Sequence, residues 1–234
     1  MMHHFFNRRE VEQRFSEGSW QKVSFAEFSA AMTTNAHPFP CVFAIEGFQE
    51  DQLRYVFLDT ISVPTLACSL ARYLADARQF GTNTSLVVFT RPGPVCPLDH
   101  YRSVFWSMLH DLVRIDGQPW PENIPKAMDD PKWEFSFAGE PVFVVCTTPA
   151  HIARQSRRST GFMITFQPRW VFDKILGTAK TTEAAFANIT KRLKRYDFIQ
   201  PSPHLGHYGD PNNREYRQYF LDDDNGTFEY PFEQ

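Results

Sequence analysis

The chain has 234 residues, of which 42% are hydrophobic and 22% charged, and its formal net charge at pH 7 is −3. These values predict one globular domain with a sizeable core, and they exclude wholesale disorder and a broad nucleic-acid-binding surface. No apolar run approaches the roughly 20 residues of a membrane helix, whereas aromatic residues are frequent, with 23 Phe, 8 Tyr and 5 Trp.

Hydrophobic patterns predict the elements of the first half of the chain. Ser24 followed by Glu27 is a capping-box pattern, which indicates the start of a helix. Two short apolar segments on either side of a polar turn are typical of a hairpin. The expected elements are a helix over 24–33, paired strands over 41–48 and 53–58, a helix over 63–80 and a buried strand over 85–89.

The second half continues the alternation of helices and strands. The expected elements are a helix over 98–115, hairpin strands over 133–137 and 142–146, a strand over 161–166 and a helix over 182–196. About six strands and four helices with two hairpins predict a single α+β domain over 1–234, built on a mixed, largely antiparallel sheet. We expect the first ~20 residues and the acidic last ~12 residues to be peripheral.

Cysteine usage and the start of the chain bear on the compartment. None of the four cysteines has CxxC spacing, and no apolar signal-peptide stretch follows Met1. Reduced thiols in a cytoplasmic protein are therefore expected. GxGxxG, P-loop and GxSxG motifs are absent from the sequence, so the nucleotide-binding and serine-hydrolase modes that use them have no support.

A polar segment over 147–158 follows a very apolar predicted strand. If it is helical, His151, Arg154 and Arg158 share one face. Imidazole is the commonest metal ligand, and neighbouring arginines suit the carboxylates of a porphyrin or a substrate. The alternative is a surface helix with solvated charges.

Two further segments could serve a cofactor. Cys41 follows His37-Pro38-Phe39-Pro40, and a thiolate held at this point could bind a metal, although a buried thiol at a strand entrance is an alternative. Phe166 and Trp170 lie in an aromatic stretch that could wall a flat cofactor or could simply be core.

A loop over 204–215 carries groups suited to a cationic ligand. Asp210, Asn213 and Glu215 are polar or acidic, and His204 and His207 have the HxxH spacing of a weak metal pair. A structured capping loop is the alternative interpretation.

Taken together, these segments resemble the YqcI/YcgG family, which is described as a family of heme-dependent N-hydroxylases. The resemblance runs from about Phe39 to Leu221. It rests on the order of many loose motifs, which are PFPC at 38–41, NTSLVVF at 83–89, FW at 105–106, QPWP at 118–121, WEFSFAGEP at 133–141, TPAH at 148–151 with Arg154 and Arg157, FQPRWVF at 166–172, LG at 205–206 and YGD at 208–210.

The resemblance implies heme b as cofactor, and dioxygen and an external electron donor as partners. It implies hydroxylation of a guanidine or amine nitrogen in a small amino-acid-like substrate. A non-catalytic heme sensor or carrier, or a small-molecule-binding protein without heme, is the alternative. No interface is marked, so a homodimer stays open.

On this resemblance we predict which residues hold heme and substrate. Iron accepts either an imidazole or a thiolate as its axial ligand, so His151 is the first choice and Cys41 the alternative. A carboxylate suits a guanidinium. The remaining predictions are that Arg154 and Arg158 hold the propionates and that Glu140, Asp210 or Glu215 receives the substrate. The aromatic residues expected to wall the porphyrin are Phe39, Trp120, Phe166, Trp170 and Phe172.

Overall fold

The computed structural model describes residues 5–175 and 179–226, which form seven α-helices around one five-stranded sheet. The helices are α1 (Arg8–Arg14), α2 (Trp20–Thr33), α3 (Val42–Gln49), α4 (Val63–Asp76), α5 (Leu98–Ile115), α6 (Arg169–Ile175) and α7 (Ala179–Tyr196). The strands are β1 (Arg54–Leu58), β2 (Leu86–Thr90), β3 (Ser136–Phe137), β4 (Glu140–Thr147) and β5 (Met163–Pro168). Three short 3-10 helices, η1 (Ala77–Gln79), η2 (Gln155–Arg157) and η3 (Glu215–Gln218), complete the described elements.

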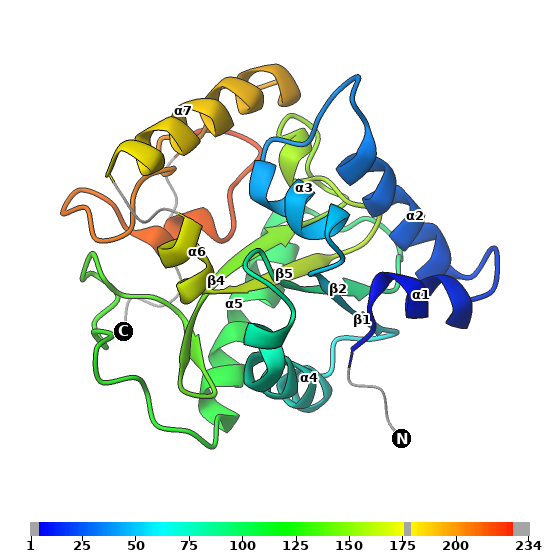
Figure 1. Cartoon of the computed structure of the whole chain (residues 1–234), viewed down its shortest axis with the longest axis horizontal. Helices are drawn as coiled ribbons and strands as arrows, with labels where there is room; N and C mark the ends of the chain where they lie inside the picture. The colour runs from blue at the N-terminus through cyan, green and yellow to red at the C-terminus, as the bar shows by residue number, and fades with distance from the viewer. Residues whose placement is uncertain (1–4, 176–178, 227–234) are drawn as a thin grey trace.

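The sheet is mixed, in the order β1-β2-β5-β4-β3. Strands β1 and β2 are parallel, and each remaining neighbouring pair is antiparallel. Helices α4 and α5 cover one face, whereas α1, α2, α3 and α7 lie on the other side (Figure 1). This is the predicted α+β domain with a largely antiparallel sheet.

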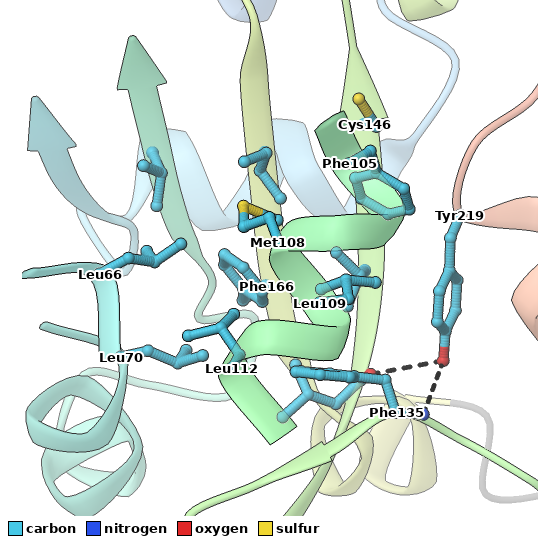
Figure 2. Close-up of a cluster of buried hydrophobic side chains, with 14 of the residues drawn as sticks. Leu66, Leu70, Phe105, Met108, Leu109, Leu112, Phe135, Cys146, Phe166 and Tyr219 are labelled. Carbon is cyan, nitrogen blue, oxygen red and sulfur yellow. Dashed lines mark hydrogen bonds between the residues drawn. The ribbon is translucent and has the colours of Figure 1, made fainter. Parts of the chain in front are cut away.

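The face under α4 and α5 carries the larger core (Figure 2). Leu66 and Leu70 of α4 and Leu109 of α5 repeat at helical spacing and are buried against sheet residues such as Phe166. The hydroxyl of Tyr219 accepts a hydrogen bond of 3.2 Å from the Phe135 N–H. The pattern that predicted both helices is therefore the pattern that fills this core.

The opposite face carries a second, smaller core. Tyr55, Val87 and Phe89 point to this side, because side chains alternate along a strand. Phe6 forms an isolated bridge with Tyr55, and Val11 of α1 is fully buried here. Beyond this smaller core, the same face of the sheet borders a cavity.

Several predicted elements are confirmed within a few residues. Helix α5 has the predicted bounds, α4 and α7 differ only near their ends, and β3 and β4 pair as the predicted hairpin. The start of α2 differs, because Ser19, whose hydroxyl accepts a 3.4 Å bond from the Lys22 N–H, caps the helix. Ser24 lies inside α2 and is buried.

The predicted strand over 41–48 is wrong, because this segment is α3, and the first predicted hairpin is therefore absent. A short run of Val, Phe and Ile suits either a helix or a strand, so its pattern cannot decide. Gly47 allows the helical choice: a Cβ at this position would lie 2.3 Å from the Asn83 carbonyl oxygen. As a result, Cys41 stands immediately before a helix rather than inside a strand.

The polar segment over 147–158 also differs from its prediction. It contains only the single 3-10 turn η2, so His151, Arg154 and Arg158 do not share a helical face. As regards membranes, the described part of the chain has no helix with the length and apolar character needed to cross one.

Candidate functional site

A cavity of about 450 Å³ occupies the hollow face of the sheet. Its volume lies within the roughly 300–1,000 Å³ that small-molecule and cofactor sites occupy. Strands β4 and β5 form the floor with alternate side chains, among them Val145 and Thr165, and helices α2, α3, α6 and α7 contribute the walls. The site therefore lies where the helices of this side leave the sheet uncovered.

The walls of the cavity are mostly apolar and aromatic. Phe39, Phe143, Phe172 and Phe186 reach it from four separate segments, and each presents a flat ring. Apolar walls strengthen the electrostatic effect of the few polar groups among them, because little water screens those groups. The polar groups of this lining therefore define its chemistry.

One polar part of the lining is a carboxyl cluster, made of Glu134, Arg169 and Glu215. Arg169 donates to both Glu134 oxygens, at 2.7 Å from Nε and 2.5 Å from Nη2, and Nη2 also donates to Glu215. Both carboxyl groups are buried, and the ring of Tyr208 lies 4.1 Å from the guanidinium carbon. Of the three, Arg169 and Glu215 line the cavity.

Electrostatics in the carboxyl cluster are dominated by burial. Burial raises the pKa of Glu215 well above its usual value, and the neighbouring Glu134 raises it further, against the opposing effect of Arg169. The pKa of Glu134 is also raised by burial. Burial lowers the pKa of Arg169, but the two carboxyl groups raise it by more, so this guanidinium stays charged.

A second polar part of the lining is Cys41, at the N-terminus of α3. Burial raises the pKa of its thiol, while the nearby backbone N–H groups of Ala44 and Phe43 and the charges of Arg192 and Arg157 lower it by less. Backbone N–H groups and the helix N-terminus favour a thiolate once a partner removes the proton. Cys41 is thus the cavity residue best prepared to act as a soft ligand.

His151 is buried beside the cavity lining, with both ring nitrogens engaged. Nε2 lies 2.7 Å from the Leu221 carbonyl oxygen, which can only accept, so Nε2 carries the proton. Nδ1 then accepts from the Thr148 hydroxyl at 2.9 Å. Burial lowers the pKa of His151 to about 4, so the ring is neutral at pH 7. This arrangement leaves neither nitrogen directed at a cofactor.

Arg154 binds the C-terminal strap, which we define as residues 221–225. Its Nε donates to the Asp222 carbonyl at 2.6 Å, and Nη2 donates to the Asp224 carbonyl and to Asn225. In return, Asp223 accepts the backbone N–H groups of 152–154 at 2.7–2.9 Å. We call His151, Arg154 and the strap together the strap cluster. It joins two distant segments of the chain, although Asp224 and Asn225 at the end of the strap are exposed.

The structure disperses the other predicted site residues. Arg158 is exposed and donates to the His151 carbonyl at 2.9 Å, Glu140 pairs with Arg78 at 2.6 Å on another side, and Asp210 accepts from Asn212 within a turn. Phe166 belongs to the core under α4 and α5 (Figure 2), and Trp170 packs against that core. Of the predicted set, Phe39, Cys41, Arg154, Phe172 and Glu215 line the cavity.

Several residues of the cavity lining, and Glu134 behind that lining, were missed by the sequence analysis. Arg169 and Glu134 sit in motifs that were noticed only as family signatures, and Arg157 was passed over in favour of its neighbours. The alternation along β4 and β5 was the available signal, since one face of each strand holds core and the other holds Thr165, Gln167 and their neighbours. Predicting the site from it requires knowing which face is left uncovered.

The fold is an α+β domain with a cavity of small-molecule size on one face of its sheet. Residues 28–233 match the YqcI/YcgG family, and the chain belongs to that family. Within the described ranges, no group of three or more His, Cys, Asp or Glu residues is placed to hold a metal ion.

Three relatives are similar in sequence to this chain over most of their length. Proteins YqcI and YcgG of Bacillus subtilis (strain 168) are each 40% identical to the chain. The match with YqcI covers 91% of the chain and 87% of YqcI. The match with YcgG covers 88% of the chain and 84% of YcgG. A protein of Streptomyces lavendulae, DcsA, named as a candidate N(omega)-hydroxy-L-arginine synthase, is 29% identical over 88% of the chain and 80% of its own length. No solved structure matches the chain.

Proposed function

We propose that the protein is a heme-dependent N-hydroxylase that acts on a guanidine or amine nitrogen of a small amino-acid-like substrate. The observation that carries the proposal is one apolar cavity that contains both a cysteine at a helix N-terminus and a carboxyl group beside an arginine. The name of DcsA supports an arginine-like substrate, because that relative is named for a hydroxylated arginine.

The cavity residues fit a heme. Four flat aromatic side chains suit a porphyrin plane, and the thiol of Cys41 is a ligand that heme iron accepts. Arg157 and Arg192 place positive charge near that thiol. Bound heme supplies the oxidation by dioxygen, with electrons from an external donor, and the protein supplies position and a dry surrounding.

The axial ligand in this proposal is Cys41 rather than His151. The N-terminus of α3 and the charges of Arg157 and Arg192 favour a thiolate at Cys41 once iron displaces its proton. His151 has no nitrogen left for a metal, since the Thr148 hydroxyl and the Leu221 carbonyl occupy both.

The substrate's cationic nitrogen is received by Glu215. A carboxylate and a guanidinium form paired hydrogen bonds, which fix the orientation as well as the charge. Asp173 also lines the cavity and adds negative charge to the same region. The aromatic walls exclude water, so these polar groups are the ones that a ligand meets.

Spectroscopy and heme content test the cofactor. Purified protein, or protein reconstituted with hemin, is expected to show a Soret band that Cys41→Ser shifts or abolishes. Cys68→Ser is the matched control, because Cys68 is exposed on α4 and outside the cavity. A protein that binds no hemin would end the heme proposal, and a Cys41→Ser variant with an unchanged spectrum would end the ligand assignment.

Turnover tests the reaction. Heme-loaded protein supplied with a reductase pair, NADH and L-arginine or a related guanidine is expected to form an N-hydroxylated product, identified by a mass increase of one oxygen. Heme binding without any product from guanidines or amines would favour a sensor or carrier.

A further inference from the structure

The carboxyl cluster holds two acidic groups but only one cation of its own. The exposed fraction is 0% for Glu134 and 5% for Glu215, and both residues form an ion pair with the guanidinium of Arg169. If both carboxyl groups were ionised, the cluster would carry one surplus negative charge in a buried place. Such a charge is expensive unless a proton or a bound cation neutralises it.

A proton is the neutralising charge when the cavity holds no cation. Glu134 and Glu215 both accept from Nη2 of Arg169, so two buried carboxyl groups lie side by side, and a proton on one of them removes the repulsion between their charges. Burial and the charge of Glu134 raise the pKa of Glu215 well above normal, so Glu215 is the group that holds the proton. The free cluster is then neutral.

The proton lies on the member of the pair that faces the cavity. Glu215 and Arg169 are part of the lining, whereas Glu134 lies behind them and is not. Arg169 is also covered by the Tyr208 ring, which fixes the guanidinium between the two carboxyl groups. A ligand in the cavity therefore meets Glu215 first and meets Glu134 only through its electrostatic effect.

We propose that Glu215 exchanges its proton for the cationic group of the ligand, so that one proton is released for each cation bound. The proposal rests on the proposed function for the identity of the site and deepens it. The charges balance: neutral Glu215 loses H⁺ to solvent, and the carboxylate then pairs with the ligand cation. The cluster with its ligand stays neutral before and after binding.

Glu134 is the positioning residue of this exchange. Both oxygens of Glu134 accept from Arg169, so the charge of this arginine is neutralised by Glu134. An ionised Glu215 therefore needs a further cation. Without that charge, Arg169 would pair with an ionised Glu215, and an incoming cation would meet a neutral ion pair with no proton to release. Glu134 therefore sets the charge of the site without touching the ligand.

Two tyrosines close to Glu215 do not supply the proton. Burial and the carboxyl groups of the cluster raise the pKa of Tyr208 to about 12, and burial raises the pKa of Tyr219 well above its usual value, so both stay neutral at pH 7. Asp173 on α6 and His207 in the loop before η3 also line the cavity. Because these two groups remain in every variant below, a proton count that changes with Glu215 belongs to Glu215.

Calorimetry with ordinary cations tests the exchange. L-arginine and agmatine are titrated into the holoprotein at pH 7 in phosphate and in Tris, whose ionisation enthalpies differ, so the difference in heat counts the protons released. About one proton per bound cation is expected, and the affinity should rise up to tenfold per pH unit while Glu215 is protonated in the free protein. Citrulline, a neutral analogue of arginine, should release none.

Variants assign the proton to its residue. Glu215→Gln and Glu134→Gln should each bring the count close to zero and weaken arginine binding at least tenfold. Glu140→Gln is the matched control, since Glu140 pairs with Arg78 outside the cavity and should keep both the count and the affinity. A merely structural role for Glu134 would alter affinity or folding without removing the proton release.

Two results would overturn the proposal. Arginine binding with no proton release would end the exchange while leaving the proposed hydroxylase intact. If arginine, agmatine and simple alkylamines all failed to bind, the proposed cation site would be wrong. The heme spectrum of the same sample tests the cofactor independently. The wild-type comparison of arginine with citrulline needs no variant, so it stands even if a substitution prevents folding.

Discussion

Two clusters of buried polar and charged side chains lie next to the cavity, and they differ in whether their charges are neutralised by the chain itself. In the strap cluster, carbonyl groups of the chain's own C-terminal segment accept from Arg154, and His151 is neutral with both nitrogens bonded. In the carboxyl cluster, two carboxyl groups compete for Arg169, and Glu215 faces the open volume. The first cluster is complete, and the second has capacity for one more cation.

The comparison teaches where to look for function among buried charges. The segment that carries His151 and Arg154 has the more conspicuous sequence, because Arg157 and Arg158 follow closely. All three arginines nevertheless donate to backbone carbonyl oxygens of the chain. Buried polar groups are normally satisfied, so density of charge alone indicates little. An imbalance of charge at a cavity is the more informative feature.

The largest expected effect is on the strap cluster. Arg154→Met removes three hydrogen bonds from a buried guanidinium and leaves their acceptors unpaired, so the free energy of unfolding should fall by about 3 kcal/mol. Urea unfolding measures it. Arg158→Met is the control, since that exposed side chain donates one bond and should cost less than about 1 kcal/mol. Equal losses would show that Arg154 is not a structural residue.

A similar but pH-dependent effect is expected at His151. Its pKa is lowered to about 4 in the folded chain, so the unfolded chain binds more protons as the pH falls from about 6.5 to 4. Over that window His151 should remove roughly 3 kcal/mol of stability, from 1.36 kcal/mol per pKa unit. The measurement is the difference in pH dependence of urea unfolding between wild type and His151→Gln, whose amide can still donate to Leu221. Parallel curves would contradict it.

The smallest effect is expected on the stability of the carboxyl cluster. Glu215→Gln keeps the shape, an acceptor for Arg169 and a donor for Glu134, and it replaces a carboxyl that is already neutral. The free energy of unfolding at pH 7 should change by less than about 1 kcal/mol, although cation binding is lost. A loss as large as that of Arg154→Met would place Glu215 among the structural charges and erase the contrast between the clusters.

Local pattern was enough to predict much of the fold. Over 98–115 the apolar residues repeat at helical spacing through five turns, and packing against the sheet requires that same stripe. The segment 41–48 has no such stripe; it folds as a helix whose Gly47 lies against the Asn83 carbonyl, a contact with a residue 36 positions away. The family resemblance was likewise predictable, because it is carried by the motifs themselves.

The site was predictable only in part. Cys41 and Glu215 were identified as chemically capable groups, and both line the cavity. Which other groups join them could not be read from spacing, because Glu134, Arg169 and Glu215 come from three distant segments. The role of His151 could not be read either, since the carbonyl that occupies its Nε2 lies 70 residues later.

Amphipathic patterns thus predicted a single α+β domain and most of its helices, because the apolar face of a segment shows in its own sequence, and the ordered motifs carried the family resemblance. Tertiary structure decided which face of the sheet stays hollow, which arginines are consumed by the chain itself and which carboxyl group is left in excess. The physical reason is that satisfaction of a charge depends on all its neighbours at once, and those neighbours meet only when the chain has folded.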